Sequence, residues 1–160
     1  MTGDSSGMVP SGDAMSRPGT GSTPMLHVAR DQLQAEQPMP DYETCTADLG
    51  EYTVVFESMP EAFPPDIAFK GLPDDACQCP HWGFLFKGRF VARFTDGREV
   101  VVTGGQAYYL PPGHTFQSLE RCETVWFSPT KEFNETFDLV AKNVEAFLGA
   151  EGQQKGAVDV

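Results

Sequence analysis

Short β-branched and aromatic segments recur through the middle of the chain, separated by turn residues. They cover residues 52–56, 77–86, 90–94, 100–102, 107–110 and 124–127. Asp96-Gly97 is a hairpin signal, and Gly-Gly at 104–105 and Pro-Pro-Gly at 111–113 mark further turns. Strands with a turn about every eight to twelve residues predict an all-β antiparallel sandwich or barrel.

The hydrophobic period changes after Ser128-Pro129. Serine is a good helix cap and proline suits the first helical turn, so a helix is expected to begin here. Gly149 would stop it. We predict one C-terminal helix over residues 129–149, packed on the barrel by an apolar stripe. The stripe consists of Phe133, Phe137, Val140, Val144 and Phe147.

The two ends of the chain lack the strand and turn pattern of the middle. The first 24 residues are mostly Gly, Ser, Pro and Thr, which cannot bury enough apolar surface to order themselves. We therefore expect a disordered or irregular tail over residues 1–40, a barrel over 41–128 and a flexible tail over 150–160. The start of the chain has neither the basic nor the apolar region of a signal peptide.

The overall charge narrows the classes of partner. Lys and Arg number 11 against 23 Asp and Glu, giving a net charge of −12. Such a chain repels nucleic acids and anionic membrane surfaces. No apolar run approaches the roughly 20 residues that span a bilayer. A cytoplasmic protein is expected, in which the four cysteines are reduced thiols or metal ligands.

Three residues with metal-binding side chains follow one another at alternate positions. Cys77, Cys79 and His81 would leave the same face of a strand, and Gly83 would leave open space beside the histidine. His114 begins the strand after the Pro-Pro-Gly turn. In an antiparallel barrel these side chains can meet in the interior, where they would form a metal site.

The same region resembles the cupin superfamily, whose first motif is G(X)5HXH(X)3–4E(X)6G. Gly88 matches the closing glycine. Counting back from it places His81 at the Glu position, Cys77 at the second His and Asp75 at the first. Gly71 fits the opening glycine with a spacing two residues too short. The glycine framework therefore matches, whereas the ligand residues are rearranged.

The second cupin motif, G(X)5PXG(X)2H(X)3N, also matches in its framework. Phe116 stands at the His position, and His114 precedes it by two residues, which keeps the same strand face. Glu120 stands at the Asn position. The fixed glycine and proline positions are matched by Gly105, Pro111 and Gly113. The resemblance, which extends to small bacterial cupins, implies a jelly-roll barrel that self-associates through a sheet. It does not imply one particular function, because cupins have many different functions.

The donor types indicate which metal would fit. Imidazole and thiolate favour a transition metal, zinc before others, over magnesium or calcium. Joint ligation by Cys77 and Cys79 would need a bend, which Pro80 would supply; otherwise one cysteine serves, and the motif count favours Cys77. The alternative is an interior that holds buried Cys and His with no metal.

Aromatic residues complete the set of candidates. Tyr108 has the parity of His114 and is expected to line the pocket or to pack in the core. The opposite face of the strand carries Trp82, Phe84 and Phe86, which are candidates for sheet packing or for a homodimer contact.

Three functions remain open from the sequence. The first is a metal-dependent enzyme acting on a small organic substrate at an open coordination position. The second is a non-catalytic module that binds or senses a small molecule or a metal, because no carboxylate occupies the Glu position of the first motif as an obvious general base. The third is a purely structural domain.

Overall fold

The computed structural model describes residues 25–61 and 65–156, with no side-chain description after residue 150. The first 24 residues of the expected tail and residues 157–160 lie outside it. A 3-10 turn (Arg30–Gln32) precedes β1 (Glu36–Met39), β2 (Tyr42–Leu49) and β3 (Tyr52–Met59). A short helix α1 (Pro65–Ala68) and a 3-10 turn (Pro73–Asp75) follow. The remaining strands are β4 (His81–Lys87), β5 (Arg89–Phe94), β6 (Glu99–Thr103), β7 (Gln106–Leu110), β8 (His114–Ser118) and β9 (Cys122–Pro129), before helix α2 (Thr130–Gly156).

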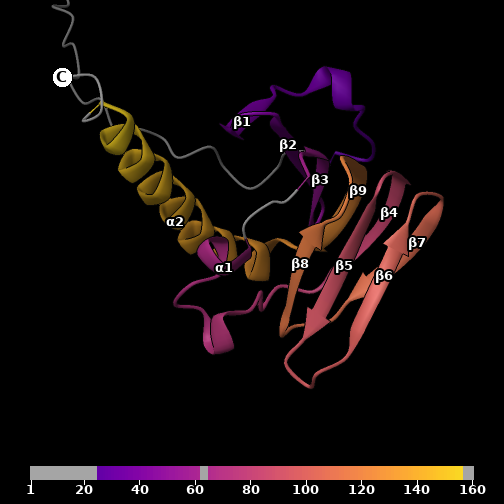
Figure 1. Cartoon of the computed structure of the whole chain (residues 1–160). Coiled ribbons are helices and arrows are strands. Elements are labelled where there is room, and N and C mark those ends of the chain that lie inside the picture. The colour runs from indigo at the N-terminus through magenta and orange to yellow at the C-terminus, as the bar shows by residue number, and fades with distance from the viewer. Residues whose placement is uncertain (1–24, 62–64, 157–160) are drawn as a thin grey trace, which may run out of the picture.

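The strands form two antiparallel sheets. The larger has the order β1-β2-β3-β9-β4-β7 and the smaller the order β6-β5-β8. Figure 1 shows the two sheets, with α2 leaving the end of β9 and α1 beside its first turns. Strands that are distant in sequence, such as β3 and β9, pair along their whole length. The predicted all-β antiparallel jelly roll with one C-terminal helix is confirmed.

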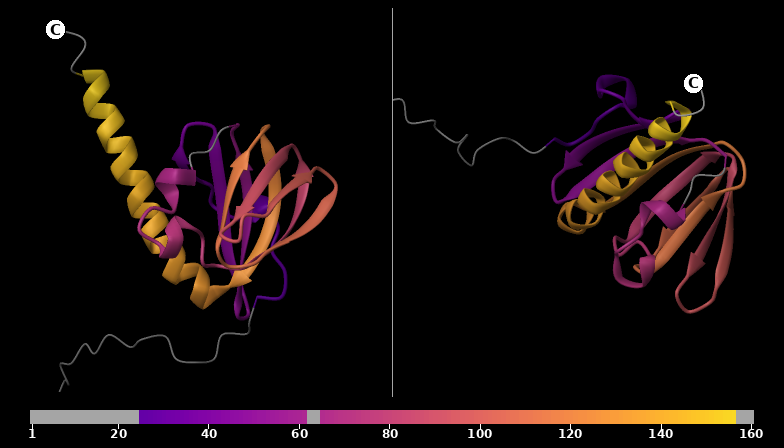
Figure 2. Two further views of the ribbon diagram at one scale, coloured as in Figure 1. Left: turned by 60° about the horizontal axis from the view of Figure 1, so that its bottom comes forward. Right: turned by 60° about the vertical axis from the view of Figure 1, so that its left-hand side comes forward.

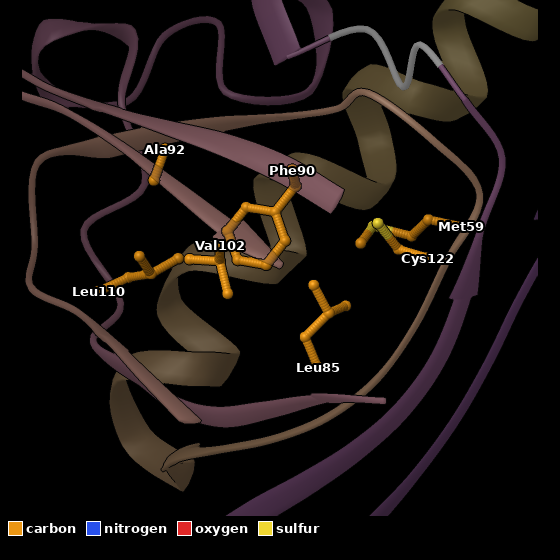
Figure 3. Packing of buried hydrophobic residues seen from close by; sticks show 7 residues of the cluster. All are labelled: Met59, Leu85, Phe90, Ala92, Val102, Leu110 and Cys122. Atoms are coloured by element: carbon orange, nitrogen blue, oxygen red, sulfur yellow. The ribbon is translucent and has the colours of Figure 1, made fainter. Parts of the chain in front are cut away.

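The hydrophobic core lies between the sheets. Its side chains come from β3, β4, β5, β6, β7 and β9, and the close-up in Figure 3 shows them converging. They are Met59, Leu85, Phe90, Ala92, Val102, Leu110 and Cys122. A second cluster joins α1 and the segment before β4 to the apolar face of α2, which the views in Figure 2 place along the open side of the sandwich. The predicted apolar stripe of the helix contributes Phe133, Phe137, Val140 and Val144 to this cluster.

Three local features differ from the expected boundaries. β1 lies inside the range expected to be an irregular tail. Ser128 and Pro129 stay in β9 because β3 continues to pair there, with Tyr52 opposite Pro129, so the helix begins at Thr130. The helix also passes Gly149 and ends at Gly156. Gly149 is not among the glycines with a positive φ, so it does not adopt the left-handed conformation that ends a helix.

The described helices include none that is both long enough and apolar enough to span a bilayer.

Candidate metal centre

Three of the predicted residues meet inside the sandwich. One ligand atom from each of Cys77, His81 and His114 lies within 4.8 Å of the other two. All three side chains are buried, with 0%, 4% and 0% of their surface exposed. We call these three residues the triad.

Backbone pairing brings Cys77 to His114. The Cys77 N–H donates to the His114 carbonyl at 2.7 Å, and the Gly113 N–H donates to the Cys77 carbonyl at 2.8 Å. Gly113 has a φ of +84°, which an L side chain rarely adopts, so the Pro-Pro-Gly turn positions the next residue. The glycine and proline framework of the second motif therefore places His114 beside Cys77.

His81 begins β4, and strand pairing fixes its surroundings. Trp82 pairs with Phe127 of β9, so Ser128 faces His81 across the two strands. The Ser128 Oγ lies 2.7 Å from Nδ1 of His81 and 2.7 Å from the Pro80 carbonyl oxygen. The single hydroxyl proton is donated to that carbonyl, which can only accept. Nδ1 of His81 must therefore carry the proton that Ser128 accepts, and Nε2 keeps a lone pair.

A similar hydrogen bond fixes the tautomer of His114. Its Nδ1 lies 2.6 Å from the Pro111 carbonyl oxygen, which requires a proton on Nδ1. Nε2 then has a free lone pair, and among the described residues it is the one buried side-chain nitrogen or oxygen without a hydrogen-bond partner. A buried acceptor without a partner costs about 1–3 kcal/mol. A metal ion would satisfy it.

The distance between two donors of the triad suits a transition metal. Sγ of Cys77 lies 3.4 Å from Nε2 of His81. Zinc bonds of about 2.3 Å to sulfur and 2.0–2.1 Å to nitrogen, at a tetrahedral angle, separate these donors by about 3.5 Å. Both imidazoles also donate their other N–H to oxygen, as metal-bound histidines do. The residues present therefore fit a metal ion.

Burial sets the protonation states of the triad. It lowers the pKa of His114 to about 4 and that of His81 well below its usual value, the latter also because of the neighbouring His114. Both imidazoles are therefore neutral at neutral pH. Burial raises the pKa of the Cys77 thiol to about 12, so a metal must displace its proton.

Cys79 lies outside the triad. The segment before β4 is not a regular strand, because Pro80 interrupts it and β4 begins only at His81. The Cys79 thiol donates to the Pro80 carbonyl at 3.8 Å, and its side chain packs with the apolar cluster around α2. Asp75 is not part of the triad either. Its carboxylate accepts a hydrogen bond from the Gly71 N–H at 2.7 Å in an exposed turn.

A cavity of about 590 Å³ adjoins the triad through His81. Side chains from the large sheet, β5, β8 and α2 line it, and most of them are apolar or aromatic. Tyr108 lines the cavity as expected from its parity. Its ring also occupies the space expected to be open at Gly83, since a Cβ there would lie 2.3 Å from Cζ of the tyrosine.

Glu57 is the residue of the cavity that sequence reasoning missed. Only 4% of its surface is exposed. One carboxylate oxygen accepts from the Tyr42 hydroxyl, and the other accepts from Nε1 of Trp126 at 3.0 Å. Burial raises the pKa of Glu57, and the two hydrogen bonds oppose that rise. A charged residue two positions from Val55, on the inward face of a strand, is the signal that could have identified it.

No protein-family model matches the sequence, and no curated protein sequence matches it. The chain is similar in structure to an RmlC-like cupin from Shewanella frigidimarina, with a TM-score of 0.47 and 15% identity over 64% of this chain and 88% of that one. KdgF from Halomonas sp. gives 0.44 and 14%, over 63% and 92% of the two chains. The S161A mutant of Bacillus subtilis oxalate decarboxylase OxdC gives 0.48 and 14%, over 69% and 30%. Because these TM-scores are below 0.5, the fold rests on the strand order and pairing described above.

Proposed function

We propose that this cupin is a metal-dependent enzyme that holds a transition-metal ion, with zinc the best fit, through Cys77, His81 and His114. The observation that supports it is the pair of fixed tautomers: both histidines keep an Nε2 lone pair, and that of His114 has no partner. A ligand atom of each lies within 4.8 Å of one on Cys77. Nitrogen and sulfur donors favour zinc over magnesium or calcium. A bound metal would act as a Lewis acid toward a ligand atom.

The cavity beside His81 would hold the substrate. Its volume of about 590 Å³ and largely apolar lining are typical of sites for small organic molecules. The residues of this chain would then bind and orient the substrate, exclude water through the aromatic lining and keep both imidazoles unprotonated for the metal.

Metal analysis of the purified chain tests the metal site. The wild-type chain is expected to carry about one metal ion, because three protein donors suffice for a catalytic zinc site. His114→Ala should lose most of it. His27→Ala is the matched control, since His27 is exposed and lies outside the triad. Equal metal content in the two variants would contradict the proposal.

A non-catalytic binding or sensor module is the second candidate. It is favoured by Glu57, the one buried carboxylate of the described cavity lining. Tyr42 and Trp126 each donate a hydrogen bond to it, which suits a group that binds a ligand more than a base that takes up a proton. Cobalt substitution distinguishes the two functions. If azide changes the visible spectrum of the cobalt-loaded chain, an open coordination position exists, as an enzyme requires; an unchanged spectrum would favour the binding module.

We also propose that the chain forms a homodimer through the outer face of the large sheet. The side chains that point away from the core there are aromatic, and Trp82, with 43% of its surface exposed, stacks on Tyr109 at 4.9 Å between ring centroids. Such a surface is typical of an interaction site. The face comprises Tyr52, Trp82, Phe84, Phe86, Tyr109 and Phe127.

Sedimentation at micromolar concentration tests this association. The wild-type chain should sediment at twice 17.5 kDa. Trp82→Ser should shift it toward the monomer, whereas Val101→Ser, an equally exposed apolar residue on β6, should not. A wild-type monomer would refute the dimer. A cytoplasmic location is part of the proposal, because reducing conditions keep the Cys77 thiol available as a ligand.

A further inference from the structure

Glu57 is a buried carboxylate that no basic side chain of the described residues neutralises. Its two recorded hydrogen-bond partners are the neutral Tyr42 hydroxyl and the Trp126 indole N–H. No ion pair of the described residues includes it. Buried carboxylates are normally paired with a cation, because removing the charge from water is costly.

The described charged residues that line the cavity around Glu57 are all acidic. Its described lining contains three glutamates and neither lysine nor arginine. Glu36 and Glu145 are exposed, whereas Glu57 is buried. In the metal-free chain, the charges of the described lining therefore favour a positive group over a carboxylate or a phosphate.

Aromatic rings surround the same space. Trp126 donates its indole N–H to Glu57 while its ring packs on His81 at 4.4 Å between centroids and on Phe137 at 5.6 Å. Phe133 stacks on Phe137 at 4.7 Å. Ring faces attract a cation that has left bulk water, so they add to the effect of the carboxylate.

We propose that the cavity binds a small organic molecule that carries a protonated amino group, and that Glu57 receives this group. Each carboxylate oxygen accepts two hydrogen bonds, and one on each is in use, so two acceptor positions remain for ammonium protons. The apolar body of the molecule would occupy the aromatic part of the cavity. The inference rests on the proposed function only in that both use the cavity beside the triad.

A series of matched probes tests the inference on the full chain. Calorimetry compares 2-phenylethylamine, the neutral 2-phenylethanol and the anionic phenylacetate, before and after chelation. The chelated chain decides the comparison with phenylacetate, because a bound metal would attract its carboxylate. A charge-assisted hydrogen bond makes the amine bind about tenfold or more tightly than the alcohol, and phenylacetate should bind least. The preference should persist after chelation, which excludes coordination of the amine to a metal. Absent amine binding, or equal or tighter binding of the alcohol or of phenylacetate, would overturn the inference.

Two variants locate the recognition at one side chain. Glu57→Gln should bring amine affinity close to that of the alcohol. Glu145→Gln makes the same charge change at an exposed lining residue and should retain the preference. A preference that survives in a folded Glu57→Gln chain, as judged by circular dichroism, would refute the role of Glu57. If that variant does not fold, the wild-type probe series decides alone.

Metal content measured on the same samples separates the two proposals. A chain that binds metal but shows no preference for the amine disproves the amine site and leaves the metal proposal standing. A chain that prefers the amine but binds no metal does the opposite.

Discussion

Replacing Ser128 by alanine tests the central element of the site, which is the orientation of His81. The serine hydroxyl accepts from Nδ1 of His81 and donates to the Pro80 carbonyl, both at 2.7 Å. Without it, a buried donor and a buried acceptor lose their partner, which destabilises the fold by about 1–3 kcal/mol. Nδ1 no longer has an acceptor that holds its proton. The tautomer with Nε2 protonated, which cannot bind the metal through Nε2, therefore becomes populated. Loss of such a supporting hydrogen bond lowers metal affinity about 10–100-fold, or about 1.4–2.7 kcal/mol.

The assay is competition for zinc between each variant and a chromophoric chelator. Ser118→Ala is the matched control, because Ser118 is also buried and donates to a proline carbonyl, that of Pro60, at 2.8 Å. It should lower the free energy of unfolding by about 1 kcal/mol and leave zinc affinity unchanged. Equal affinity of Ser128→Ala and wild type would refute the role of Ser128. Equal losses in both variants would show a general effect of destabilisation instead.

Three further outcomes follow from the geometry. Zinc binding should release one proton per ion at neutral pH, because the Cys77 thiol, with a pKa raised to about 12, is protonated and both imidazoles are already neutral. The affinity for zinc should then fall about tenfold for each unit by which the pH is lowered. Potentiometry should find no such dependence in the Cys77→His variant, which has no thiol proton to release. Cys79→Ser should leave zinc affinity within about threefold in the chelator assay, since Cys79 is not part of the triad. Gly83→Ala should lower stability to urea by about 1–3 kcal/mol because its Cβ would meet the Tyr108 ring at 2.3 Å, whereas Gly149→Ala should raise it by about 0.5–1 kcal/mol.

Strand parity made much of the site predictable from the sequence. Alternation places His81 and Leu85 inside and Trp82, Phe84 and Phe86 outside, as their exposure shows. The spacing of glycine and proline around the 111–113 turn indicates where the strand of His114 begins. These predictions depend on local geometry, which a single segment of sequence contains.

Contacts that depend on the register between distant strands could not be predicted. Ser128 lies 47 residues from His81, and only the pairing of β4 with β9 brings the two together. Ser128 was expected to cap the helix, a role its local sequence fits equally well. Glu57 meets Trp126, 69 residues away, through the pairing of β3 with β9. The sequence pattern indicates which face of a strand a side chain occupies. Which side chain of another strand it contacts is decided by how the strands pair in the folded sheet.

Trp126 contacts both the triad, through His81, and Glu57. Its ring packs on His81 of the triad, in which Nε2 of His114 has no hydrogen-bond partner. Its indole N–H donates to the carboxylate of Glu57, which no ion pair of the described residues neutralises. Each group would be stabilised by a positive charge: a metal ion at the nitrogen and sulfur donors, and an ammonium group at the carboxylate. Because one indole contacts both places, a molecule whose amino group lies at Glu57 would have its nearest apolar or polar atoms beside His81. The metal site and the amine site are therefore expected to act on the same bound molecule.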